Sequence, residues 1–165
     1  MIYPDKHLYL MHSNEPWVTT FSLSASKHLV LNTGKYSRKF GISALHKHIE
    51  EIVKENKISL LFLELSTNII DPFVLEELKS KYKLTLVLFQ LDDEFKFETI
   101  SATYATIADL VLTLDYVSID RYRQSGINAH LFMHSIYMPD QKILDEKEGG
   151  NYEVCFLGRL ADKPS

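Results

Sequence analysis

Three consecutive acidic residues, Asp92, Asp93 and Glu94, are the first feature of this sequence that could do chemistry. They come shortly after an apolar run from Leu84 to Phe89. Adjacent carboxylates can bind a divalent metal ion, or one of them can act as a general base. The same residue types are also favourable at the start of a helix without any catalytic role. Both interpretations stay open, and under the first one Asp92 and Asp93 are catalytic.

The second candidate is His12, which ends the mostly apolar segment His7 to His12. An imidazole at the end of a strand can serve as a base near neutral pH. The alternative is an ordinary loop histidine that makes hydrogen bonds, and the sequence alone does not decide between them. His130 and His134 lie four residues apart across an expected strand, which is a poor spacing for a metal pair.

These residues must be positioned by regular elements, and strand-like and helix-like segments alternate along the chain. Apolar positions at steps of three and four residues predict helices, and short apolar runs predict strands. Asp71 and Pro72 together form a strong helix start. The segment Asn32-Thr33-Gly34 is typical of a loop. Strands are predicted at 7–12, within 19–31, and at 59–65, 84–89, 110–114 and 127–133, and helices at 43–55 with Ser43 as N-cap, 71–81, 97–108 and 118–124.

Apolar strands separated by amphipathic helices predict a parallel sheet with right-handed crossovers and helices on both faces. The expected fold is therefore α/β and Rossmann-like. Ligands of such sheets bind beyond the carboxyl ends of the strands. This rule selects the loops at 12–14, 66–68, 90–94 and 115–116. Their candidate substrate-binding residues are Ser13, Asn14, Ser66, Asn68, Glu94 and Tyr116.

Composition and charge narrow the class of protein. The chain has 165 residues and a formal net charge of −4, which argues against nucleic acid or an anionic membrane surface as a partner. No segment is long enough to cross a bilayer, and the single cysteine, Cys155, lies in an apolar run, so we expect a cytoplasmic protein. The motifs GxGxxG, GxxxxGK[ST], GxSxG and HExxH are absent, which argues against dinucleotide enzymes, P-loop NTPases, α/β-hydrolases and zincins.

The composition changes near the C-terminal end. Residues 140–151 are polar and charged, and an apolar strand-like run follows them. We therefore expect a Rossmann-like domain over 1–139, a linker over 140–151, and over 152–165 the opening strand of a second domain that is missing.

Several landmarks occur in a recognisable order: LVLFQLDDEF at 86–95, ADLVLTLD at 108–115, YRQSG at 122–126, Met138-Pro139, and VCFLGR at 154–159. In this order the stretch from Leu60 to Gly158 resembles the spore-maturation (CgeB-like) group of glycosyltransferases. Members of that group have the two-domain GT-B architecture. The resemblance covers roughly 100 residues and rests on the order of these landmarks.

The resemblance implies that this chain is the N-terminal, acceptor-side domain of an enzyme that transfers a sugar from a nucleotide-sugar donor. The acceptor would be a carbohydrate or a protein, and neither a cofactor nor a metal ion is implied. The donor would be bound mainly by the missing domain, with Gly158 and Arg159 on the donor side. His12, Asp92 and Asp93 would be the candidate catalytic residues, and the acid pair would orient the acceptor, act as the base or shape the cleft. This chain alone would be inactive.

Two other functions stay open. One is a free-standing binding or regulatory module of the flavodoxin or receiver type, although the acid pair of receivers follows the first strand and here it follows a later one. The other is a protein without catalysis, in which an exposed sheet edge pairs with another chain.

Overall fold

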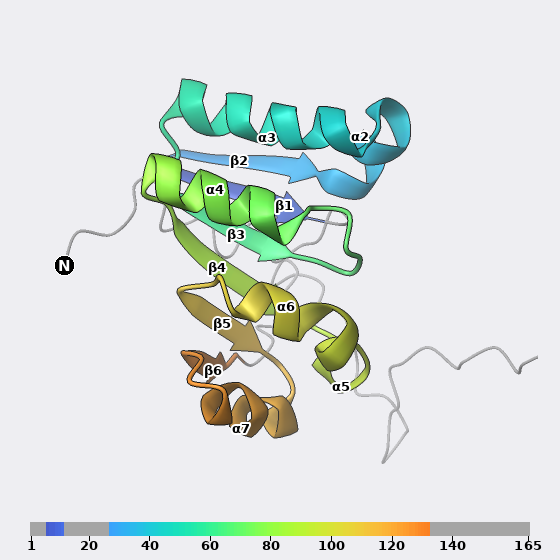
Figure 1. Ribbon diagram of the computed structural model, residues 1–165, viewed down its shortest axis with the longest axis vertical. Helices are drawn as coiled ribbons and strands as arrows, with labels where there is room; N and C mark the ends of the chain where they lie inside the picture. The colour runs from blue at the N-terminus through green and yellow to red at the C-terminus, as the bar shows by residue number, and fades with distance from the viewer. Residues whose placement is uncertain (1–5, 12–26, 133–165) are drawn as a thin grey trace, which may run out of the picture. The chain divides into compact units, whose positions relative to one another are not determined.

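The computed structural model of the chain describes residues 6–11 and 27–132. In these residues six strands form one sheet in the order β2-β1-β3-β4-β5-β6, and every pair of neighbouring strands is parallel (Figure 1). The predicted α/β class and Rossmann-like parallel sheet are confirmed. The strands are β1 Lys6–Met11, β2 Lys27–Asn32, β3 Leu60–Glu64, β4 Thr85–Gln90, β5 Leu110–Thr113 and β6 Ala129–Leu131.

From β2 onward helical elements connect the strands, and α3, α4 and α7 begin within two residues of the predicted starts. Asp71 caps α4 because its carboxylate accepts a hydrogen bond from the Phe73 amide at 2.9 Å, and Pro72 is the first helical residue. The helical elements are α2 Thr33–Phe40, α3 Ile42–Asn56, α4 Pro72–Tyr82, α5 Asp93–Lys96, the π-helix η1 Phe97–Ser101, α6 Ala102–Ala105 and α7 Tyr116–Gln124.

The sheet has an apolar core on each face. The larger core joins alternate strand residues such as Leu61 and Leu86 to side chains of α3, α4, η1, α6 and α7. All the described helices that contribute to a core pack on this face, and α4 lies in front of the strands in Figure 1. The second core consists of strand residues: Tyr9, Met11, Phe62, Val87 and Phe89. Any helix on this second face, as predicted, lies outside the described residues.

Two predictions about the first helices are wrong. Asn32 to Gly34 do not form a loop: Asn32 ends β2 and caps α2, accepting a hydrogen bond from the Lys35 amide at 2.7 Å. Thr33 is buried and donates to the Met11 carbonyl at 3.0 Å. The N-cap of α3 is Gly41 rather than Ser43, and the φ of +88° at Gly41 is a conformation that favours glycine.

The predicted helix at 97–108 is part of a longer helical segment that begins at Asp93. A π-helix interrupts this segment at Phe97–Ser101, and π-turns of this kind often occur at functional sites. Phe97, Ile100 and Tyr104 all reach the larger core. The Tyr104 hydroxyl donates to the Ile70 carbonyl at 2.5 Å, and burial, followed by the charge of Asp71, raises the pKa of Tyr104 to about 12.

The chain divides into two compact units, Met1–Ser135 and Ile136–Ser165. The second unit lies entirely outside the described residues, and so do the predicted linker, the predicted strand after it and Cys155. Of the described helices, none combines the length and the apolar character that crossing a bilayer requires; the longest, α3, has 15 residues.

Candidate functional site

The carboxyl ends of the strands define the candidate site. β1 lies between β2 and β3, so the chain turns toward one edge of the sheet after β1 and continues toward the other edge from β3 onward. Parallel sheets bind ligands at such a switch point. The loop after β3, helix α5 and the start of α7 all follow strand ends on this side (Figure 1).

The strands β3, β4 and β5 each end on this side with a buried polar residue, whereas β1 ends with the apolar Met11. Glu64 ends β3 with 7% of its surface exposed, Gln90 ends β4 with 2% exposed, and Thr113 ends β5 with none exposed. Thr113 has a clear structural role because its hydroxyl accepts a hydrogen bond from the Asp115 amide at 3.1 Å. A polar group that is removed from water without a hydrogen-bond partner costs folding free energy. We therefore asked which partners the polar atoms of Gln90 and the neighbouring loop residues have.

Unpartnered buried groups gather at this edge. Gln90 Nε2, Ser66 Oγ and Thr67 Oγ1 are shielded from solvent and make no hydrogen bond in the described part of the chain. Ser101 Oγ in η1 is also buried, but it faces the Tyr122 hydroxyl and so does not belong to this set. More than about 90% of buried polar groups in proteins have a partner. Ser66, Thr67 and Gln90 thus form a set of unpartnered polar groups that follow or end β3 and β4, and neighbouring atoms cover each of them.

The structure separates the two aspartates of the acid pair. Asp93 is fully buried, and the Tyr122 hydroxyl lies 2.9 Å from each of its carboxylate oxygens and donates to them. Tyr122 is also fully buried; its burial first, and then the charge of Asp93, raise its pKa far above the usual range. This contact fastens α5 to α7, and Asp93 is not accessible to a substrate in this arrangement.

Asp92 and Glu94, in contrast, are exposed. The Asp92 side chain is 54% exposed and forms an ion pair with Lys96 Nζ at 2.6 Å. The Asp92 carbonyl accepts hydrogen bonds from the amides of Phe95 and Lys96, so Asp92 begins α5. The residues thus occupy a helix start, and Asp92 is the member of the pair that a ligand could reach. In the described residues, no three His, Cys, Asp or Glu side chains lie close enough together to hold a metal ion.

The end of β5 supplies a second capped helix. The Asp115 carboxylate accepts hydrogen bonds from the amides of Val117 and Ser118, both at 3.1 Å, and from the Ser118 hydroxyl at 2.5 Å. The bond from the Ser118 hydroxyl is the largest cause that lowers the pKa of Asp115. Asp115 is therefore committed to the start of α7, and the adjacent Tyr116 projects its ring outward with 76% of its surface exposed.

Exposed aromatic side chains border the same edge. Phe73 is 75% exposed in α4 and Phe95 is 79% exposed in α5; with Tyr116, each lies within the first three residues of a helix that follows a strand end. Large apolar groups that stay exposed often mark an interaction surface. The edge thus combines buried polar groups with exposed aromatic rings.

Hydrogen bonds connect the loops of this edge. Asn68 Nδ2 donates to the Thr99 carbonyl in η1 at 3.0 Å, and the Leu114 amide donates to the Gln90 carbonyl at 3.3 Å. The predicted residues Ser66, Asn68, Asp92, Asp93, Glu94 and Tyr116 therefore all lie on the side of the sheet that the strand-end rule selects. The predicted residues His12, Ser13, Asn14, Gly158 and Arg159 lie outside the described residues.

The sequence prediction named neither Glu64 nor Gln90 as a site residue, although Gln90 lies in the predicted strand-end loop 90–94, and it did not find the partner of Asp93. Glu64 interrupts an apolar strand and Gln90 directly follows one, so a polar residue at the last position of an apolar run was the available signal. Tyr122 is separated from Asp93 by 29 residues, and no local pattern indicates that the two side chains meet.

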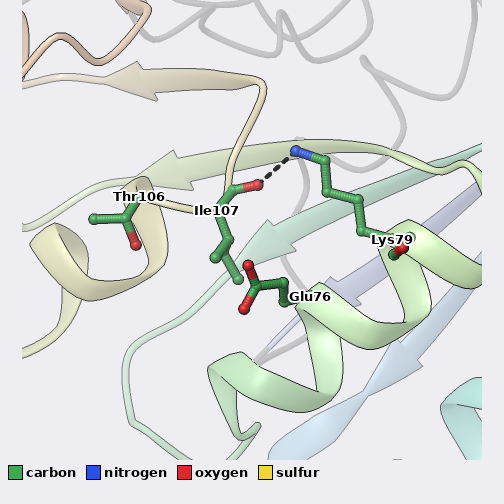
Figure 2. Close-up of a pocket in the computed structure, with 5 residues that line it drawn as sticks. Glu76, Lys79, Thr106 and Ile107 are labelled. Carbon is green, nitrogen blue, oxygen red and sulfur yellow. Dashed lines mark hydrogen bonds between the residues drawn. The ribbon is translucent and has the colours of Figure 1, made fainter.

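A separate groove lies between α4 and the turn that follows α6. It encloses about 250 Å³ and is lined by Glu76, Lys79, Ser80, Thr106 and Ile107 (Figure 2). Lys79 Nζ already donates to the Ile107 carbonyl at 2.8 Å and pairs with Asp109 at 2.7 Å. Because Asp109 directly precedes β5, this groove lies at the amino ends of the strands, and its lysine ties α4 to the start of β5.

No protein-family model matches the sequence, and no curated protein is significantly similar to it. The resemblance to the spore-maturation glycosyltransferases therefore stays a prediction from the sequence landmarks.

Proposed function

We propose that this chain is the acceptor-side N-terminal domain of a glycosyltransferase that moves a sugar from a nucleotide-sugar donor to a hydroxyl group of an acceptor. The observation that carries the proposal is the group of unpartnered buried atoms of Ser66, Thr67 and Gln90 at the strand ends. Sugar hydroxyls both donate and accept hydrogen bonds, so they complement two hydroxyl groups and an amide NH₂.

The exposed rings support the same ligand class. A pyranose ring has apolar C–H faces, and aromatic side chains offer a large rigid surface for them. Tyr116 and Phe95 lie on the first turns of α7 and α5, beside the strand ends that carry the buried polar atoms. Ligand sites commonly combine apolar walls with a few well-placed polar groups.

In the proposed reaction, the acceptor oxygen attacks the anomeric carbon, and the nucleoside diphosphate leaves with the electron pair of the broken bond. A base takes the proton of the acceptor hydroxyl. Asp92 is the accessible carboxylate of the acid pair, and His12 remains the other proposed base. Asp93 is reassigned from catalysis to positioning, because its bonds to Tyr122 hold α5 in place.

Saturation-transfer NMR with a panel of methyl glycosides and uridine diphosphate sugars tests this proposal. We expect weak but specific transfer to the ring protons of at least one glycoside, and no tight binding of the nucleotide-sugars, since the donor belongs to the other domain. Gln90→Leu should abolish the transfer, whereas Gln124→Leu, at an exposed residue of α7, should not. Absence of transfer to every glycoside would contradict the proposal.

A second function is favoured by one observation: the first five strands have the order 2-1-3-4-5, which flavodoxins and receivers share. A receiver needs an accessible aspartate, and Asp92 is exposed. Incubation with acetyl phosphate followed by intact-protein mass spectrometry separates the two functions. A phosphoryl adduct that disappears in Asp92→Ala would replace the glycosyltransferase proposal with this one.

A further inference from the structure

Strand β2 forms one edge of the sheet, away from the candidate site on β3 and β4. Within the described residues it pairs with β1 alone. Val30, in the middle of β2, is 45% exposed, and His28 is exposed as well. An edge strand offers backbone N–H and C=O groups to another chain, and exposed charges or a covering element usually prevent this pairing.

The helix that follows β2 carries a local positive charge. Within Thr33–Phe40 there are three basic residues, Lys35, Arg38 and Lys39, and no acidic residue. None of the three forms an ion pair among the described side chains. This charge contrasts with the net charge of −4 for the whole chain, so α2 forms a local positive patch that attracts anions.

A groove joins the edge strand to this basic helix. It encloses about 270 Å³, and its lining comes from the end of β2 (Leu31 and Asn32) and from α2 (Lys35, Tyr36, Lys39 and Phe40). Tyr36 is held in place because its ring stacks on His48 at 4.6 Å and packs against Phe40 at 4.7 Å. The groove thus has an aromatic wall, which α3 holds in place, and two lysines also line it.

We propose that β2 and this groove bind an extended acidic segment of a partner protein, which adds to the sheet edge as a further strand. Backbone hydrogen bonds to β2 would supply sequence-independent affinity, and a pocket for one side chain would supply specificity. Lys35 and Lys39 would pair with a carboxylate of that segment, while the exposed Val30 would pack against an apolar residue next to it. This inference does not depend on the proposed glycosyltransferase function.

Charge selects this occupant over others. Three basic residues on one short helix give too small a positive field for nucleic acid or a membrane surface when the whole chain carries −4. A second copy of this chain that paired through β2 would bring the strand KHLVLN to this edge, and that strand has no carboxylate to meet Lys35 and Lys39. A short partner segment with carboxylates needs only a small positive field, and it supplies the negative charge that Lys35 and Lys39 can bind.

Fluorescence anisotropy with three labelled octapeptides tests the proposal on the whole chain. The peptides alternate valine with glutamate, with glutamine or with lysine, so they share a strand-forming pattern and differ in charge. We expect binding of the glutamate peptide that weakens as salt rises from about 50 to about 500 mM, and at least roughly tenfold weaker binding of the other two. Equal binding of all three peptides, or binding of none, would overturn the proposal.

Two charge-reversal variants locate the site. K35E/K39E should lose the glutamate peptide and gain the lysine peptide, whereas K47E/K54E, at two exposed lysines of α3, should keep the original preference. Circular dichroism confirms that each variant is folded. Hydrogen exchange should slow at the β2 amides when the glutamate peptide binds. Unchanged exchange in β2, or a dimer that already protects β2 without peptide, would contradict strand addition.

Discussion

Asp92 and Asp93 are neighbours in the chain, yet they lie in opposite environments. Asp92 is exposed and paired with Lys96, while Asp93 is fully buried against the hydroxyl of Tyr122. A buried carboxylate is tolerated only when it is hydrogen-bonded, so the Tyr122 hydroxyl is a requirement for the packing of α5. At the scale of single residues, Asp92 is therefore the accessible carboxylate of the pair, and Asp93 has a structural role.

Tyr122→Phe should therefore destabilise the protein. The substitution removes one oxygen and leaves Asp93 buried without its donor, which we expect to lower the free energy of unfolding by about 1–3 kcal/mol. Tyr82→Phe is the matched control, because the Tyr82 hydroxyl donates to Glu50 at 3.0 Å in a more exposed setting. Urea denaturation of both variants measures the difference, and equal losses would show that Asp93 does not depend on Tyr122.

Asp115→Ala should reduce stability in a pH-dependent way. The hydrogen bond from Ser118 lowers the pKa of Asp115 below its ordinary value of 3.8, so the carboxylate stabilises the fold above that value, and this contribution is lost as the pH falls through the lowered pKa. We expect the variant to cost about 1 kcal/mol at neutral pH and less in acid. Asp115→Asn keeps a cap oxygen without the charge and should cost less. Urea denaturation at neutral and at acid pH measures the loss in the free energy of unfolding. An equal loss for Asp115→Ala at both pH values would contradict this account.

At the scale of elements, strands and most helices follow from apolar patterning, because each needs an apolar face for the core. The apolar runs at 59–65 and 84–89 predict β3 and β4 within a residue or so at each end. Helix α2 was missed because Asn-Thr-Gly also fits a turn, and the long-range contact of Thr33 with β1 that accompanies the helix cannot be read from the local sequence. The π-helix at 97–101 was missed because its pattern differs from an α-helix by a single residue.

The central strands should carry more stability than the edge strands. Leu61→Ala in β3 empties a fully buried position and should cost about 2–5 kcal/mol in the free energy of unfolding. Leu131→Ala in β6, where the side chain is 41% exposed, makes the same chemical change and should cost less than about 1 kcal/mol. Thermal or urea unfolding gives both values. Equal costs would mean that the core does not lie under β3 as described.

At the scale of the described sheet, the strand-end rule predicted the side on which polar residues gather, and Ser66, Asn68 and Tyr116 lie there. The rule could not identify Gln90 or Glu64 as buried, because burial of a strand end depends on neighbouring elements that are distant in the sequence. The rule also could not show that the Asp93 carboxylate is hydrogen-bonded to the Tyr122 hydroxyl. The central claim is that the orphan groups at the ends of β3 and β4 are completed by a bound sugar.

The most direct measurement of that claim is the side-chain amide signal of Gln90 in ¹H–¹⁵N spectra, recorded while a methyl glycoside is added. We expect this signal to shift together with the backbone amides of Ser66 and Thr67, and the amides of α2 and of the groove at Lys79 to stay unchanged. A Gln90 signal that does not move while the glycoside saturates another surface would contradict the account.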